Sequence, residues 1–163
     1  MAAKFSRIIF IECVTDKILV LKLNFGRRQI RCAGGIGEVC NRLKDSENSC
    51  VVVDEDPTKT RPKYMIDLLR TSVVSNDHDI IVAHDGKRNN YLIVICPDRE
   101  NWLIKTAKLL KIDLKSYGLP PNPKELKVLN LRDPRKIEPF IEDLLKFDHP
   151  RIKELKKAFG MCK

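Results

Sequence analysis

Three acidic side chains stand where neighbouring strands of a sheet are expected to end. Glu12 ends the apolar run of residues 7–12, and Asp54 and Asp56 directly follow the apolar run 49–53. The carboxyl ends of parallel strands meet at one edge of an open sheet, and alternation puts the two aspartates on the same side of an extended backbone. Mg²⁺ prefers oxygen ligands and commonly takes only one or two carboxylates, with water and substrate phosphate as its other ligands. The spacing therefore predicts a phosphoryl-transfer site for Mg²⁺, or for Mn²⁺ as its substitute.

Each of these acids also has a simpler interpretation. An Asp-x-Asp step after an apolar strand is often a solvated strand end, and Glu12 by itself can cap the following helix. Because three acids occupy three expected places, we favour the metal site. Asp16, four residues after Glu12, and Glu100 are further candidates, although Glu100 also suits the first turn of a helix, where a negative charge is favourable.

Candidate substrate-binding residues are glycines and lysines. Gly34 and Gly35 follow the second expected strand, where they allow either a phosphate to approach the backbone or a plain turn. Lys59 follows the two aspartates. A further set of lysines at three-residue spacing shares one face of an expected helix, as a phosphate-binding stripe or as a solvated face: Lys105, Lys108 and Lys111.

Short apolar runs that alternate with helical patterns position these residues. Strands are expected at 7–12, 29–32 and 49–53, with helices at 17–23 and from about 36 to 44 between them. This β-α-β-α-β order predicts a right-handed, largely parallel sheet. A helix over 61–71 and two strands at 79–83 and 91–96, which form a possible hairpin, follow.

The remainder of the chain is expected to be helical. Asp98 suits the cap of a helix that runs to about residue 111. Residues 118–123 form the clearest break, and two or three short helices begin near prolines 123, 134 and 150. The predicted fold is α/β, a mostly parallel, Rossmann-like sheet of about four to five strands flanked by helices. Residues 1–97 form this domain, and residues 98–163 form a basic helical extension packed on it.

Composition indicates a globular protein with an uneven positive charge. Of the net charge of +9, residues 99–163 carry +7. A basic segment beside an acidic site suits nucleic acid, because lysines attract phosphates; solubility alone explains the charge equally well. No stretch approaches the roughly 20 apolar residues that span a bilayer, so we expect a cytoplasmic protein without a membrane partner. The six dispersed cysteines are then expected to be free thiols.

Together these motifs resemble the TOPRIM superfamily, which includes topoisomerases, bacterial primases and nucleases. The matching residues lie in IIFIECVTDK (Glu12 and Asp16), CAGGIGEV (Gly34 and Gly35) and VVVDEDP (Asp54 and Asp56). The resemblance implies that Glu12 acts as a general acid or base, or as a metal ligand, and that the two aspartates hold magnesium. The chain also resembles small stand-alone TOPRIM-like proteins at Cys96–Leu103, where it contains a Pro-x-x-Glu-x-Trp-Leu element.

The chain departs from that family after the aspartates, where many members have a third acid and a glycine and this sequence has Pro57-Thr58-Lys59-Thr60. The first hypothesis is a magnesium-dependent nuclease or related phosphotransferase that acts on DNA or RNA. The alternative is a noncatalytic subunit that binds nucleic acid or a nucleotide in a larger complex, with an ATPase subunit as one candidate partner. A structural or regulatory subunit with an incomplete metal site is the third.

Overall fold

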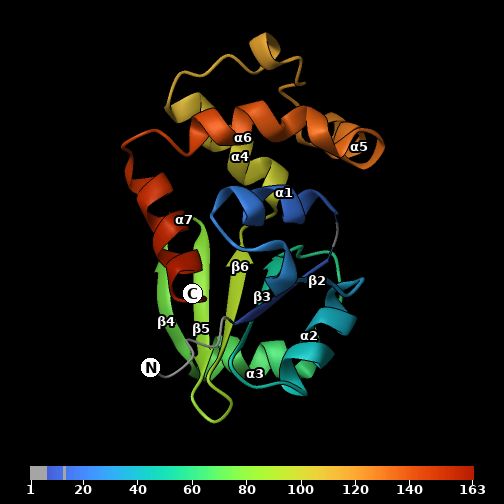
Figure 1. The fold of residues 1–163 in the computed structure, drawn as a ribbon, viewed down its shortest axis with the longest axis vertical. Coiled ribbons are helices and arrows are strands. Elements are labelled where there is room, and N and C mark those ends of the chain that lie inside the picture. The colour runs from blue at the N-terminus through green and yellow to red at the C-terminus, as the bar shows by residue number, and fades with distance from the viewer. Residues whose placement is uncertain (1–6, 13) are drawn as a thin grey trace.

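A six-stranded mixed sheet forms the centre of the protein. The computed structural model describes residues 7–12 and 14–163, and its strand order is β2-β1-β3-β6-β5-β4 (Figure 1). Along the chain the strands are β1 (Ile8–Ile11), β2 (Ile30–Cys32), β3 (Ser49–Asp54), β4 (Val73–Asp77), β5 (Ile80–Asp85) and β6 (Asn90–Ile95).

The α/β class with flanking helices is confirmed, while the expected strand number and sheet type need correction. Strands β2, β1, β3 and β6 pair in parallel, whereas β5 and β4 are antiparallel, so the sheet is mixed and has six strands. The strand that the sequence pattern missed is β4, an edge strand. Its residues are exposed or half-buried, and Ser75, Asn76 and Asp77 give it no apolar alternation.

Helices cover both faces of the sheet. Alternate residues of the strands point to opposite faces, so that Val52 belongs to one core and Val51 to the other. The smaller core contains α2 (Ile36–Lys44) and α3 (Lys63–Thr71). The larger core contains α1 (Val14–Lys22), α4 (Arg99–Leu109), α5 (Pro123–Arg132), α6 (Glu138–Leu144) and α7 (Pro150–Gly160).

The C-terminal helices share their core with the sheet. Trp102, Phe140 and Phe159 are among the largest fully buried side chains, and they lie in the same cluster as Ile9 and Ile93. In Figure 1, α1, α4, α5 and α6 lie beyond one end of the sheet, and α7 runs beside β4 and β5. Short 3-10 helices complete the chain: η1 (Arg27–Gln29), η2 (Leu114–Tyr117) and η3 (Pro134–Ile137). No helix in the described part of the chain is long and apolar enough to cross a membrane.

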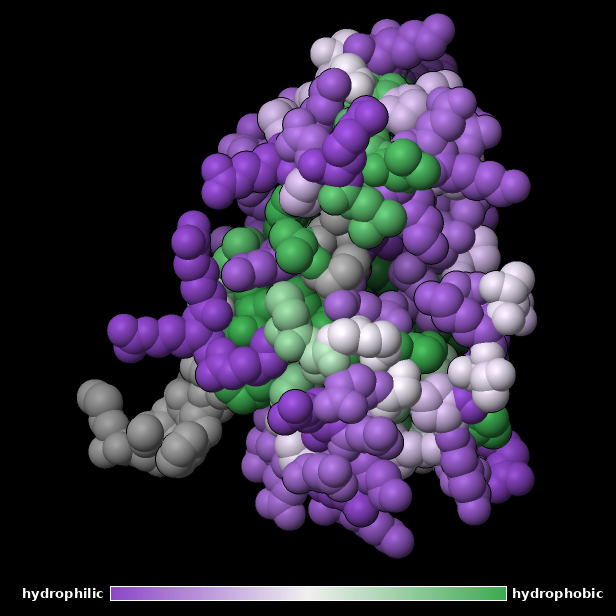
Figure 2. Space-filling model, turned by 90° about the vertical axis from the view of Figure 1, so that its right-hand side faces the viewer, coloured by the Kyte–Doolittle hydropathy of each residue, from purple (hydrophilic) through white to green (hydrophobic). Residues whose placement is uncertain are grey.

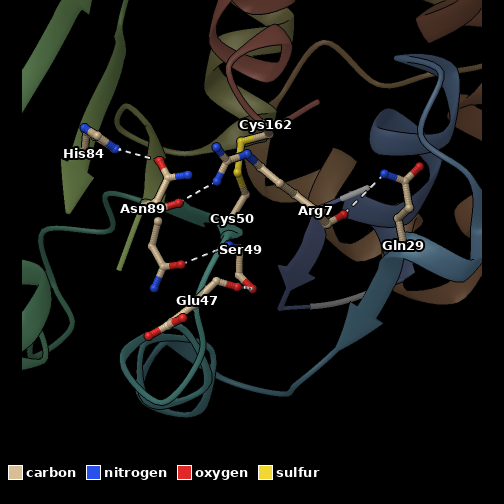
Figure 3. The surroundings of a disulfide bond; sticks show 9 residues. Arg7, Gln29, Glu47, Ser49, Cys50, His84, Asn89 and Cys162 are labelled. Atoms are coloured by element: carbon tan, nitrogen blue, oxygen red, sulfur yellow. Dashed lines mark hydrogen bonds between the residues drawn. A yellow bond between two sulfur atoms is a disulfide. The ribbon is translucent and has the colours of Figure 1, made fainter. Parts of the chain in front are cut away.

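The cysteines correct one expectation. Cys50, in β3, and Cys162, which follows α7, form a disulfide across a sequence separation of 112 residues (Figure 3). Both residues are buried, and burial does not exclude a bond between them. The local pattern holds no signal for a partner so far away. Cys32, Cys40 and Cys96 are free, and Cys13 lies outside the described residues.

We expect the Cys162→Ser variant to unfold at a lower urea concentration than the wild-type protein, with a loss of about 2–4 kcal/mol. A cross-link that closes a loop this long removes much conformational freedom from the unfolded chain. Equilibrium unfolding without reductant measures the loss, and Cys32→Ser, at an exposed free thiol, is the control. Equal stability of Cys162→Ser and the wild type, with no disulfide-linked peptides after digestion, would show that the bond does not form.

Candidate metal and substrate site

A pocket of about 400 Å³ lies at the carboxyl ends of β1 and β3, between these strand ends and the helices α4 and α5. It gathers residues from five separate segments of the chain. Its wall consists of Glu12, Asp16, Gly34, Gly35, Asp54, Lys59, Arg99, Glu100, Lys127, Asn130 and Leu131. Four acids and three bases are among these residues, so both signs of charge meet in one pocket.

Most of the site residues expected from the sequence line this pocket, and four do not. Those that line it are Glu12, Asp16, Gly34, Gly35, Asp54, Lys59 and Glu100. The four outside its wall are Asp56, Lys105, Lys108 and Lys111. The pocket therefore unites the ends of β1 and β3 with the glycine turn, and adds residues of α4 and α5 that the spacing did not indicate.

The side chain of Asp56 contacts residues of its own loop. Its carboxylate accepts a hydrogen bond from the Thr58 hydroxyl at 2.6 Å and pairs with the Lys59 ammonium at 3.3 Å. These partners, the Thr58 hydroxyl foremost, hold the pKa of Asp56 below its ordinary value. The backbone turns at this residue, which has a φ of 35°, so the strand alternation that would align it with Asp54 has already ended.

The expected lysine stripe is broken. Helix α4 ends at Leu109, and Lys111 lies beyond it with a φ of 57°, so Lys111 does not continue the helical face. Lys105 is paired with the Asp79 carboxylate at 2.7 Å. Lys108 is exposed. These three lysines therefore do not form one row beside the acidic pocket.

Glu12 and Asp54 sit in an environment that opposes their negative charges. Burial, followed by the nearby charge of Asp16, raises the pKa of Glu12 above its ordinary value. Burial is also the main reason why the pKa of Asp54 is raised to about 7, and the charge of Arg99 only partly offsets this. A cation in the pocket would stabilise both carboxylates in their ionised form.

Arg99 is the central cation of the pocket. Its buried guanidinium forms ion pairs with Asp16 and, at 2.6 Å, with Glu100, while its backbone N–H donates to Asp54 at 3.0 Å. Burial tends to raise the pKa of Glu100, but the charge and hydrogen bonds of Arg99 outweigh burial and hold that pKa below its ordinary value. Arg99 thereby connects the start of α4 to acids from α1 and β3.

Arg99, Lys127 and Asn130 were missed by sequence reasoning, although two of them leave a faint signal. A cation in the first turn of a helix, as at Arg99, is electrostatically unfavourable unless acids compensate it. Asn130 lies inside α5, where asparagine is a poor helix former. Lys127 has no such signal, because only the packing of α5 over the strand ends brings it to the pocket.

A larger groove of about 700 Å³ lies on another side of α5. Its floor is apolar, and its wall has one acid, Glu125, among four bases: Lys115, Lys124, Arg132 and Lys136. Figure 2 shows the side of the molecule on which α5 and α2 lie; hydrophobic side chains gather in its middle, and hydrophilic ones crowd its upper and lower parts. The groove offers binding surface and positive charge, while the groups with acid–base or metal chemistry are in the smaller pocket.

The donor set of the smaller pocket suits a cation held by two carboxylates. Within residues 7–12 and 14–163, no group of three or more His, Cys, Asp and Glu side chains is arranged to hold a metal ion. Mg²⁺ nevertheless commonly binds through one or two carboxylates with water and substrate as the other ligands. Glu12 and Asp54, which share the pocket and both have raised pKa values, meet that requirement.

Comparisons with family models, curated proteins and solved structures found no match for this chain. The resemblance to the TOPRIM superfamily therefore stays a prediction from the motifs.

Proposed function

We propose that the protein is a magnesium-dependent phosphoryl-transfer protein that acts on nucleic acid, most simply a nuclease, with Glu12 and Asp54 as the metal ligands. The observation that carries this proposal is the convergence of these two acids, both with raised pKa values, in one pocket with Lys59 and Lys127. In this proposal Asp56 is not a metal ligand. Its carboxylate forms an ion pair with Lys59 and so belongs to the loop that holds that lysine.

The charge of the pocket supports a phosphodiester as the substrate. The wall contains four carboxylates and three bases, so its net charge is −1 when all are ionised. One divalent cation changes that to +1, which a phosphodiester of charge −1 neutralises. Without the cation, the negatively charged phosphodiester would meet a pocket whose net charge is also negative.

Several groups of the wall have a role in this proposal. A bound Mg²⁺ would polarise the scissile phosphate and offset negative charge on the leaving oxygen. Lys59 and Lys127 attract the phosphate, while Glu12 and Asp54 would hold the cation, which keeps both carboxylates ionised. Gly35 precedes α2, and an added Cβ there would meet nothing within 4 Å, so a phosphate can approach the start of that helix.

The basic surface of α5 supports a long polyanion over a small one. Lys124 and Arg132 line the apolar groove, and Lys127 lines the acidic pocket, so the helix presents cations toward both hollows. Ion pairs do not neutralise any of these three side chains within the described part of the chain. A nucleic acid strand that crosses α5 would contact both sets of charges.

The second candidate is a noncatalytic subunit that holds nucleic acid or a nucleotide, within a complex that includes a partner such as an ATPase. The ion pairs of Arg99 favour it, because they already supply a positive charge to Asp16 and Glu100. In that case the pocket would bind a phosphate without cleaving it.

Cleavage and metal binding should both depend on Glu12. We expect Glu12→Gln to lower Mg²⁺-dependent cleavage of single-stranded and duplex RNA and DNA about 100-fold, and to weaken Mn²⁺ binding measured by calorimetry. Glu47→Gln, which removes an exposed acid outside the pocket, is the matched control and should change neither. Mn²⁺ binding without cleavage of any substrate would support the noncatalytic candidate; absence of both would refute the metal site.

A further inference from the structure

Helix α5 exposes large apolar side chains to water. Leu131 and Val128 are 71% and 61% exposed, more than any other large hydrophobic side chain in the described part of the chain. They are neighbours on the helix surface, and Val128 lines the larger groove. Valine forms helices less readily than lysine or glutamate, so the stability of α5 by itself does not favour valine at an exposed position. Contiguous apolar surface of this kind commonly marks a binding site.

The floor of the larger groove extends the apolar surface of Val128. The other apolar residues of this floor are Leu119, Pro120, Pro121 and Leu129. Pro121 is exposed, and Pro120 and Leu129 are half-buried, so their side chains are accessible from the groove. Proline has a fixed φ, so this part of the floor loses little conformational freedom when a ligand binds. The volume of about 700 Å³ accommodates side chains of a short segment, not a folded domain.

Cations without acidic partners surround the apolar floor. The wall contains four bases and one acid, so its net charge is +3 when all are ionised. Within residues 7–12 and 14–163, no ion pair neutralises any of the four bases, which are Lys115, Lys124, Arg132 and Lys136. The charge complementary to this groove is therefore negative, and the floor requires that the partner also carries apolar groups.

An acidic protein segment fits both features better than nucleic acid or a second copy of this chain. Phosphates would pair with the bases, but none of the described residues that line the groove has an aromatic ring on which a nucleobase could stack. A second copy carries a net charge of +9, so it would be repelled by a groove that is itself positive.

We propose that the larger groove binds an acidic segment of a partner protein. Apolar side chains of that segment cover Val128 and the prolines of the floor, and its carboxylates pair with Lys124 and Arg132. This inference goes beyond the proposed function, which uses the positive charge of α5 but not the apolar floor. Because a nucleic acid strand that crosses α5 would need the same two cations, the segment and the strand would compete for them.

Labelled peptides test the proposal by fluorescence anisotropy. The probe is a peptide of about 16 residues in which pairs of leucines alternate with pairs of glutamates, and two comparison peptides have serine for every leucine or lysine for every glutamate. We expect the wild-type protein to bind the probe at least about 10-fold more tightly than either comparison peptide, because only the probe supplies both apolar groups and negative charge.

Two variants of the groove should weaken binding of the probe. Val128→Glu places a negative charge in the apolar contact, and we expect it to weaken binding about 10-fold. Lys124→Glu, which reverses a charge of the wall, is the second variant in case the first does not fold. Val74→Glu is the matched control, because Val74 is a similarly exposed valine on β4, outside the groove, and this variant should bind as the wild type does.

Other results would overturn the proposal. If the serine peptide binds as tightly as the probe, charge alone explains the binding. If neither groove variant weakens binding of the probe, the site lies elsewhere. If the probe does not bind, while Val128→Glu weakens binding of a single-stranded oligonucleotide, the groove is a nucleic acid surface. If the wild type sediments as a dimer and Val128→Glu as a monomer, a second copy covers the floor. None of these results bears on the metal site, which Glu12→Gln tests separately.

Discussion

Replacing Arg99 with Met is expected to lower the free energy of unfolding by about 3–5 kcal/mol near neutral pH. The guanidinium is buried and forms ion pairs with Asp16 and Glu100, whose side chains are also buried. Removing the cation leaves two carboxylates without their compensating charge in a poorly solvated place. They must then take up protons or draw in water, and both responses disfavour the folded state.

Urea unfolding at several pH values tests this expectation. The loss should shrink as the pH falls, because Glu100, whose pKa Arg99 holds below its ordinary value, can then be protonated. Adding Asp16→Asn and Glu100→Gln to Arg99→Met should recover much of the stability, because no uncompensated acid then remains. Arg28→Met, at an exposed arginine, is the control for the removal of a positive charge. A loss of less than about 1 kcal/mol, unchanged with pH, would contradict the central role of Arg99.

Replacing Asp54 with Asn is expected to stabilise the metal-free protein at alkaline pH by up to roughly 4 kcal/mol. Burial raises the pKa of Asp54 to about 7 from its ordinary 3.8. Between those values the folded protein keeps a proton that the unfolded chain releases. The stability contributed by this group is therefore present below about pH 4 and is lost as the pH rises through 7. Asparagine cannot ionise, so the variant should not show this loss.

Unfolding experiments in a chelator from pH 4 to 9 measure the difference between the wild type and Asp54→Asn. The difference should grow with pH, and Mg²⁺ should reduce it by stabilising only the wild-type carboxylate. Asp56→Asn is the control, and its effect on stability should have the opposite sign. Thr58 and Lys59 hold the pKa of Asp56 below its ordinary value, so removing this carboxylate should destabilise the protein modestly at neutral pH. A wild type and Asp54→Asn that respond identically to pH would show that Asp54 is not in a charge-opposing environment.

Local patterns in the sequence were sufficient for most of the regular elements and for the placement of Glu12 and Asp54 in one pocket. Strands β1 and β3 are short apolar runs that end at the acids, and the antiparallel pair β5 and β6 matches the two runs around residues 84–90. Asp98 caps α4 as expected, since its carboxylate accepts from the Asn101 N–H at 2.8 Å. Glu12 and Asp54 were found because the carboxyl ends of adjacent parallel strands must lie close together.

Contacts between distant segments were decided only by the tertiary structure. The packing of α5 over the strand ends brings Lys127 and Asn130 to the pocket, and the turn after β3 directs Asp56 to Thr58. The disulfide joins Cys50 to Cys162, and edge strand β4 is held by pairing with β5. Repeats of two or 3.6 residues report which face of an element is buried, but they do not specify which distant segment covers that face. That choice depends on the fit and charge of whole surfaces in the folded chain.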